Sequence, residues 1–156
     1  MAVARSLTRR LGMEGKVRFQ QGSGTAIPFA GTSFDVATLI HVGMNIADKR
    51  RVFREVKRVL VLGGIFGIYD QMREAPGDLT YPVPWATTPE ASFVDEPETY
   101  KRLLTEAGFE IVWERSCRED ALAAFQRQPL PLTGAELPPL GLHVTMGPSI
   151  IERGAN

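Results

Sequence analysis

The sequence has only one cysteine, no long apolar run and no excess of either charge. Cys117 cannot form an internal disulfide and has no Cys or His neighbour at metal-ligand spacing, so we expect a small buried apolar side chain and no metal site. Eighteen Lys and Arg balance eighteen Asp and Glu, which argues against nucleic acid or anionic lipid as a partner. No apolar run approaches the ~20 residues of a membrane span, and residues 1–10 lack the apolar core of a secretory signal. We therefore expect a cytoplasmic protein that does not bind membranes.

The composition is typical of one globular domain. Of the 156 residues, 44% are hydrophobic and 23% are charged, which excludes a disordered chain and a coiled coil. Most of the 11 prolines lie in residues 76–97 and 129–148, which are therefore predicted to be loops.

Apolar periodicity predicts helices and strands in alternation. Val3, Leu7 and Leu11 recur every four residues and precede Gly12, a pattern typical of the end of a helix. The complete pattern predicts helices over residues 2–11, 45–62, 97–107 and 120–128, strands over 17–20, 35–40, 65–70 and 109–117, and a strand or extended loop over 142–146. With crossovers long enough for parallel pairing, this order predicts an α/β fold, an open and mostly parallel sheet with flanking helices.

The helix predicted over residues 45–62 has the clearest pattern. Asn45 can cap it, with Asp48 three residues on as in a capping box; the alternative is that Asn45 contacts a ligand. Gly63 and Gly64 are expected to end it, and one face is apolar: Val52, Phe53, Val56, Val59 and Leu60. The other face carries six cations, which we interpret as solvated, with nucleic-acid binding as the alternative: Lys49, Arg50, Arg51, Arg54, Lys57 and Arg58.

The predicted topology selects a candidate site. Ligands of open α/β sheets bind beyond the carboxyl ends of the strands, which here means residues 22–25, 40–45 and 70–85. Gly22-Ser23-Gly24 on its own is a weak motif. The stiff stretch 81–85 carries Tyr81 and Trp85, whose aromatic faces can bind a cationic amine or a flat acceptor; the alternative is a satellite hydrophobic cluster.

Four short motifs occur in a fixed order along the chain: Gly22 to Gly24, Ile27-Pro28-Phe29, Ser33-Phe34-Asp35, and Arg58 to Gly64. Together they resemble the second half of a class I S-adenosylmethionine-dependent methyltransferase, in the small-molecule branch that includes ubiquinone and menaquinone biosynthesis enzymes and sarcosine/dimethylglycine methyltransferases. The resemblance implies an incomplete Rossmann-like sheet and S-adenosylmethionine as cofactor. It divides the chain into a partial methyltransferase domain over residues 1–128, without its first βαβ unit, and a Pro-rich tail or cap segment over 129–156.

The resemblance also implies roles for individual residues. It places Ser23, Gly24, Thr25 and Ile40 at the cofactor, and Met44, Asn45, Tyr81 and Trp85 at the methyl acceptor. His41 is the side chain near the site of the type that titrates near neutral pH, so we expect it to act as a base or to position the acceptor. The alternatives are a structural histidine at 41 and a core methionine at 44. Ser23 stands where the family has an adenine-contacting Asp, which predicts weaker adenine binding.

The expected function is that of a methyltransferase with a small-molecule acceptor, present as a truncated domain. The family's glycine-rich first loop and its ribose-binding acidic residue are expected upstream of Val17, where this sequence has 16 residues. Removing inner strands would expose apolar surface, so we expect a homodimer or higher oligomer, with exchanged elements as one form. A rearranged sheet in which residues 17–21 pair elsewhere is the other possibility. The alternative function is a catalytically silent α/β remnant that self-associates or binds a partner.

Overall fold

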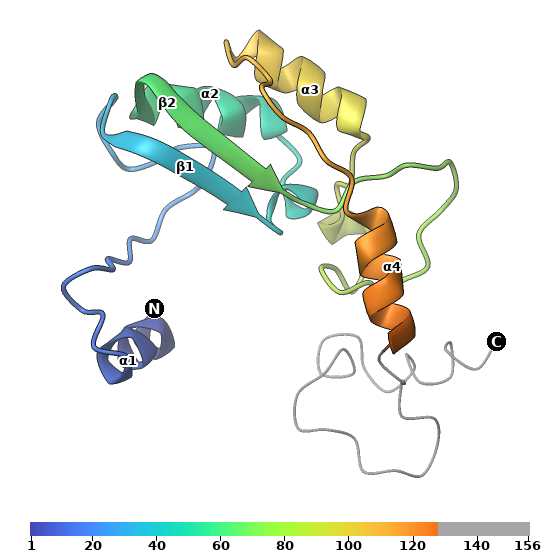
Figure 1. Ribbon diagram of the computed structural model, residues 1–156, viewed down its shortest axis with the longest axis horizontal. Helices are drawn as coiled ribbons and strands as arrows, with labels where there is room; N and C mark the ends of the chain where they lie inside the picture. Colours follow the sequence, from blue (N-terminus) through green and yellow to red (C-terminus); the bar gives the residue numbers. More distant parts are fainter. Residues whose placement is uncertain (128–156) are drawn as a thin grey trace.

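A two-stranded parallel sheet lies at the centre of the fold. The computed structural model describes residues 1–127. Strands β1 (Phe34–Ile40) and β2 (Leu60–Tyr69) are joined through helix α2 (Lys49–Val59), and they pair from Val36 opposite Ile65 to Ile40 opposite Tyr69 (Figure 1). The predicted α/β fold with parallel strands and flanking helices is thereby confirmed.

Helix α2 covers one face of this sheet and forms most of the core. Asp48 caps its first turn by accepting a hydrogen bond from the Arg51 amide at 2.9 Å, and Lys57 and Arg58 lie in the last turn, where cations are favourable. The predicted apolar stripe is buried in full, with each side chain at most 6% exposed: Val52, Phe53, Val56, Val59 and Leu60. Inward-facing side chains of both strands pack against this stripe: Ala37, Leu39, Phe66 and Ile68.

Helix α3 (Pro97–Glu106) packs beside α2 and contributes Tyr100 and Leu103 to the core. Pro97 is its first residue, as predicted, and Gly108 follows its end with φ +86°. Helices α1 (Ala2–Arg10) and α4 (Arg118–Arg127) confirm the predictions for residues 2–11 and 120–128. Short 3₁₀ turns occur at η1 (Gly43–Asn45) and η2 (Pro89–Ala91). None of the helices in the described part of the chain is long and apolar enough to cross a bilayer.

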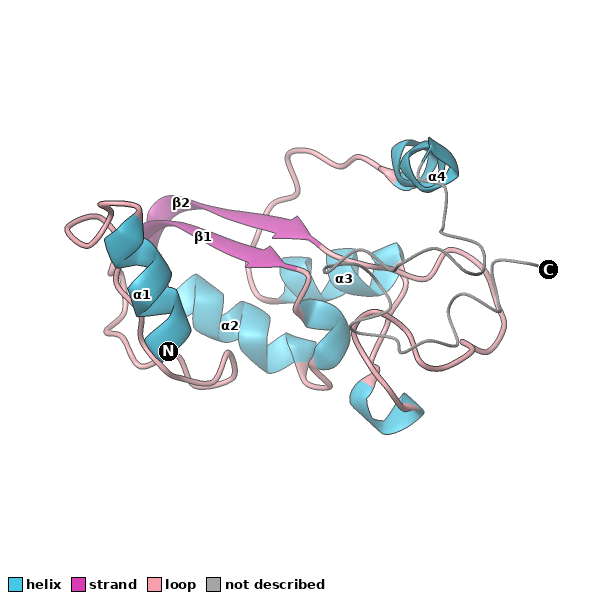
Figure 2. Cartoon of the chain, turned by 90° about the horizontal axis from the view of Figure 1, so that it is seen from below, coloured by secondary structure: helices cyan, strands magenta, loops and turns pink. Residues whose placement is uncertain are grey.

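The second face of the sheet has no helix on it among the described residues. Figure 2 shows α2 and α3 on the same side of β1 and β2. The outward side chains of the strands are apolar and half or more exposed: Val36 (56%), Ile40 (56%), Ile65 (64%) and Tyr69 (51%). Helix α1 lies apart from the sheet (Figure 1), and its stripe of Val3, Leu7 and Leu11 is also at least half exposed. The structure thus has two apolar surfaces without a partner in residues 1–127.

Two predicted strands are wrong. Residues 17–20 and 109–117 are irregular, with no ladder of hydrogen bonds to β1 or β2. Both have strand-like side chains, but an extended segment becomes a strand only beside another strand. Val112 and Trp113 are accordingly 87% and 75% exposed. The predicted segment 142–146 and the predicted tail 129–156 lie outside the described residues.

The predicted boundaries of α2 also need correction. The helix starts at Lys49, not Asn45, and it ends at Val59, because Leu60 already has extended dihedrals and pairs with Phe34. Gly63, with φ +78°, lies instead at the irregular start of β2. Cys117 is half-buried, not fully buried as expected.

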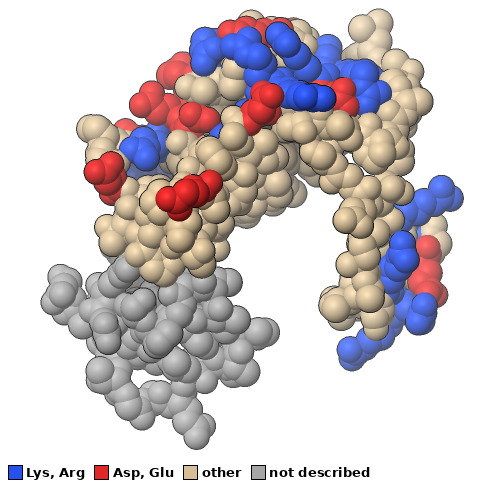
Figure 3. All heavy atoms as spheres, turned by 180° about the vertical axis from the view of Figure 1, so that it is seen from behind, with Lys and Arg blue, Asp and Glu red and all other residues tan. Residues whose placement is uncertain are grey.

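The six cations of α2 differ in their exposure. Lys49 is only 2% exposed, whereas the other five are exposed as predicted. Arg50 pairs with Glu106 of α3, and Arg58 pairs with Glu55. Acidic and basic side chains are intermixed on the face shown in Figure 3. Such a surface lacks the uniform charge of a nucleic-acid patch.

Candidate functional site at the carboxyl end of the sheet

The site begins with a tight turn at residues 23–26 that packs beside the start of α2. A carbon in the Cβ position of Gly24 would lie 3.5 Å from Val52 Cγ2 and 3.9 Å from Ile46 Cδ1. Arg51 Nε donates to the Thr25 carbonyl at 2.8 Å, which ties the turn to the helix. The Ser23 hydroxyl accepts from the Thr25 amide and remains exposed. The structure therefore brings the predicted cofactor segment next to the segment that follows β1.

His41 follows β1 directly, in a strained conformation. Its φ of +50° is uncommon for a residue other than glycine. The His41 amide donates to the Tyr69 carbonyl at 2.8 Å, and its ring meets the Tyr69 ring edge-on at 4.8 Å. Within residues 1–127 the imidazole nitrogens make no hydrogen bond, so both can contact a ligand. Ile40, the other predicted site residue here, is 56% exposed at the end of β1.

Asp70, at the end of β2, is fixed by a buried tyrosine. Tyr100, 2% exposed, donates its hydroxyl to Asp70 Oδ2 at 2.8 Å, while Asp70 Oδ1 accepts from the Gln71 amide. Burial and then the bond to Asp70 raise the pKa of Tyr100 far above its ordinary value, so the hydroxyl remains a donor. A Cβ on Gly43 would lie 2.2 Å from Asp70 Oδ2. A side chain at position 43 would therefore displace Asp70 and the Tyr100 hydroxyl.

The turn η1 connects this cluster to a long loop. Met44 is 3% exposed and its carbonyl accepts from the Phe93 amide at 2.7 Å, which agrees with the core interpretation of its side chain. Asn45 does not cap α2, in contrast to the prediction. Its amide nitrogen donates to the carbonyls of Trp85 (2.8 Å) and Ala91 (3.0 Å). Asn45 therefore holds the loop in place, and Asp48 caps the helix.

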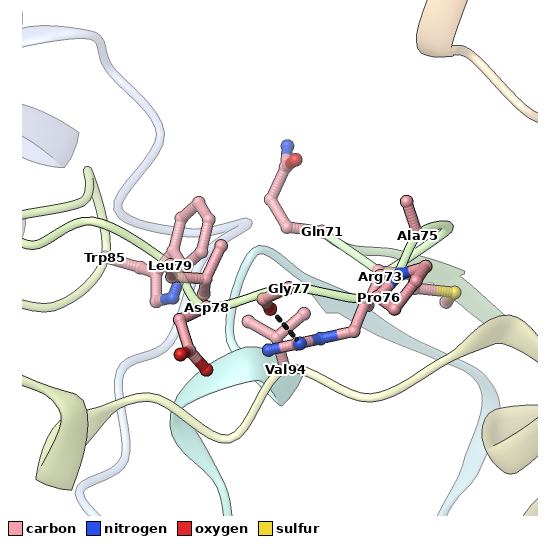
Figure 4. A pocket seen from close by; sticks show the side chains of 10 residues that line it. Gln71, Arg73, Ala75, Pro76, Gly77, Asp78, Leu79, Trp85 and Val94 are labelled. Carbon is pink, nitrogen blue, oxygen red and sulfur yellow. Dashed lines mark hydrogen bonds between the residues drawn. The ribbon is translucent and has the colours of Figure 1, made fainter.

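A hollow of about 220 Å³ lies beyond the end of β2 (Figure 4). Its apolar lining comes from Met72, Leu79, Trp85 and Val94, and Arg73 and Asp78 supply charge. Arg73 Nη1 donates to the Gly77 carbonyl at 2.5 Å. Trp85 lies between Val83 and Ala86, which pair with each other in a tight turn. Tyr81 lies just before that turn and does not line the hollow.

Sequence reasoning missed Lys49 and Tyr100 at this site. The pattern places Lys49 on a solvated face, and it gives Tyr100 no role beyond its place in the helix predicted over residues 97–107. Their partners, Asp95 and Asp70, lie 46 and 30 residues away in the chain, so no local spacing reveals them. The available signal was Tyr100 itself, because a buried tyrosine hydroxyl requires a hydrogen-bond partner.

Comparison with known proteins identifies the fold's lineage. Residues 1–68 match the family model described as a methyltransferase domain. This part of the chain is similar to methyltransferase domains. An uncharacterized methyltransferase of Bacillus subtilis, YcgJ, is 41% identical over 76 residues, or 49% of this chain and 29% of the relative. The ubiquinone/menaquinone biosynthesis C-methyltransferase UbiE of Klebsiella pneumoniae is 34% identical over 64 residues, or 41% of this chain and 26% of the relative.

A solved structure extends this similarity over the described fold. The [4+2]-cyclase SpnF has a TM-score of 0.63 and 27% identity, and the match covers 99% of this chain but 53% of that chain. The chain thus spans less than a third of the curated relatives above and about half of SpnF. Because the neighbour is named as a cyclase, the fold alone does not define the reaction. The reaction depends on the side chains of the site.

Proposed function

We propose that this chain forms the acceptor side and the adenine-contacting turn of an S-adenosylmethionine-dependent methyltransferase that acts on a small molecule. The observation that supports this most strongly is the meeting of three segments at one end of the sheet. Residues 23–25 contact Ile46 and the start of α2 there, and residues 41–45 are joined to residues 70–95 by hydrogen bonds. Ligands of open α/β sheets bind at this edge.

The size of the hollow supports a small acceptor. Its volume of about 220 Å³ is below the ~300–1,000 Å³ of pockets that hold drug-sized ligands. The indole of Trp85 and the side chain of Leu79 give it an apolar wall, and Arg73 and Asp78 can orient polar groups. A polymer would require a longer groove than these residues form.

The site residues of this chain are better suited to positioning the methyl acceptor than to forming a covalent bond with it. S-adenosylmethionine, when bound, supplies an electrophilic methyl group on a sulfonium. Methyl transfer needs the nucleophile held in line with that group, in a site that excludes water. His41 can accept a proton from an acceptor that must lose one, because its ring nitrogens are unpaired within residues 1–127. Of the cofactor contacts, Ser23 fits the adenine amine only as a neutral acceptor.

Calorimetric titration with S-adenosylhomocysteine tests this proposal. We expect binding in the micromolar range, and we expect Ser23→Asp to tighten it by about tenfold because a charged acceptor forms a stronger hydrogen bond. Ser33→Asp, which adds the same charge in the loop before β1, is the control and should bind as the unchanged chain does. The absence of heat at millimolar ligand, in the unchanged chain and in Ser23→Asp alike, would contradict the proposal and leave the silent remnant.

A further inference from the structure

The loop of residues 71–96 forms most of the candidate acceptor pocket but has almost no regular structure of its own. Only η2 interrupts it. A loop of this length keeps one conformation only if the rest of the protein binds it. The segment Met44 to Lys49 provides such binding, and we refer to its contacts with residues 85–95 as the loop clamp.

Lys49 is the central residue of the loop clamp. Its ammonium group has three donors, and each meets an acceptor: the Ile46 carbonyl at 3.0 Å, the Phe93 carbonyl, and Asp95 Oδ2 at 2.9 Å. The group also lies 5.6 Å from the centre of the Tyr100 ring. One acceptor therefore comes from the turn before α2 and two come from the loop.

The rest of the loop clamp comes from η1 itself. Asn45 donates both amide hydrogens to loop carbonyls, those of Trp85 and Ala91, and the Met44 carbonyl accepts from the Phe93 amide. The Trp85 ring is then fixed by its own Nε1, which donates to Ser92 Oγ at 3.1 Å. The clamp thus fixes both the backbone and the ring of the residue that lines the pocket.

The chemistry of Lys49 indicates a role in geometry. A charge that is 2% exposed loses most of its hydration, and an apolar side chain of similar size often stabilises a fold as well or better. An apolar side chain forms no directional hydrogen bonds, so it cannot hold three acceptors at defined positions. A buried lysine therefore ties residues 93 and 95 to one place relative to α2.

We propose that Lys49 is a positioning residue, which with Asn45 holds Trp85 as a fixed wall of the acceptor pocket. This inference rests on the proposed function for the identity of the pocket. The clamp itself is a property of the free protein, so its test needs neither cofactor nor acceptor. The two proposals can therefore fail separately.

Trp85 fluorescence provides the test. The chain has two tryptophans, and Trp113→Phe removes the other, which is 75% exposed. In that background we expect Lys49→Met and Asn45→Asp to shift the Trp85 emission to the red and to raise its quenching by acrylamide. Asn45→Asp keeps the side chain's shape but removes both donors. Lys49→Arg should restore part of the signal, and Arg54→Met, an exposed cation on the same helix, is the control and should change nothing.

The outcomes separate positioning from simple stability. A clamp variant should release Trp85 while its far-UV circular dichroism remains that of the folded chain. If Lys49→Met fails to fold, Asn45→Asp decides, because Asn45 is exposed and its loss leaves no buried charge. Unchanged Trp85 emission and quenching in a folded Asn45→Asp protein would overturn the proposal. Released Trp85 together with no S-adenosylhomocysteine binding would support the clamp and contradict the methyltransferase.

Discussion

Single atoms decide the geometry at the end of β2. Gly43, Asp70 and Tyr100 meet so closely that the absence of a Cβ at position 43 is a condition of the Tyr100–Asp70 hydrogen bond. That bond in turn fixes the point at which the loop of residues 71–96 leaves the sheet. A change of one methyl group here should therefore act on the whole site.

We expect Gly43→Ala to lower the free energy of unfolding by about 1–3 kcal/mol, because the new methyl group would overlap Asp70 Oδ2 and the Tyr100 hydroxyl. Gly67→Ala is the matched control. Its Cβ would lie 3.8 Å from Thr38 Cγ2, so its stability should change by less than about 0.5 kcal/mol. Urea unfolding followed by circular dichroism measures both. Equal stability of the two variants would show that the packing around Gly43 is looser than described.

At the scale of elements, the motif Ile27-Pro28-Phe29 is held to α2 by two charged side chains. Glu55 Oε2 accepts from the Ile27 amide at 2.9 Å, and Arg58 donates to the carbonyls of Ile27 and Phe29. The hydrogen bond from Arg58 and then the one from Ile27 lower the pKa of Glu55 from 4.5 to about 2. The folded chain thus favours the Glu55 carboxylate.

This pKa predicts the response of the chain to acid. Since the folded pKa of Glu55 lies below the unfolded one, its contribution to stability is complete above about pH 4.5 and is lost as the pH falls toward 2. We expect Glu55→Gln to be less stable than the unchanged chain at pH 7 and to lose less stability between pH 4.5 and 2. Urea midpoints across this range provide the measurement. Parallel pH profiles for the two proteins would contradict the role given to Glu55.

The elements also show what the sequence could predict. Helical periodicity located α2 and α3, because one buried stripe is a local pattern. The alternating strand pattern gave the wrong result for residues 17–20 and 109–117, because strand formation depends on a neighbouring strand elsewhere in the chain. The prediction that Asn45 caps α2 was also wrong. Asn45 and Asp48 can both cap a helix, but Asn45 bonds carbonyls 40 and 46 residues away, so Asp48 is the cap.

The candidate site shows the same contrast between local patterns, which the sequence reveals, and contacts between distant residues, which it does not. The rule that ligands bind beyond the carboxyl ends of strands selected residues 22–25, 40–45 and 70–85. In the structure, residues 41–45 bond the loop after β2, and residues 24–25 pack against Ile46 and the start of α2. The rule did not select the side chains that hold these segments in place. Burial of Lys49 depends on Phe93 and Asp95, which no motif connects to it.

At the scale of the whole molecule, the dominant feature is an apolar face of the sheet that no helix of residues 1–127 covers. Parallel sheets normally carry helices on both faces. Here Val36, Ile40, Ile65 and Tyr69 are half or more exposed, and so is the apolar stripe of α1. Helix α1 stands apart from the sheet (Figures 1 and 3). We propose that a second copy of the chain covers this face, with α1 exchange as one way to do so.

Light scattering after size-exclusion chromatography tests this assembly. We expect a mass of at least twice the 17.2 kDa of the chain at micromolar concentration, and Ile65→Lys should shift it toward the monomer by placing a charge on the face. Leu122→Lys, which adds the same charge on α4, should leave the mass unchanged. A well-folded monomer of the unchanged chain would rule out this assembly.

The most direct test of the account is hydrogen exchange, followed by mass spectrometry, with and without S-adenosylhomocysteine at about 1 mM, a concentration far above a micromolar dissociation constant. We expect slower exchange in residues 22–26 and 40–46, which are the turn beside the start of α2 and the segment that follows β1. Residues of α1, which lies apart from the sheet in Figure 1, should exchange as before. Exchange that is the same with and without the ligand in residues 22–26 and 40–46 would contradict a methyltransferase site at this end of the sheet.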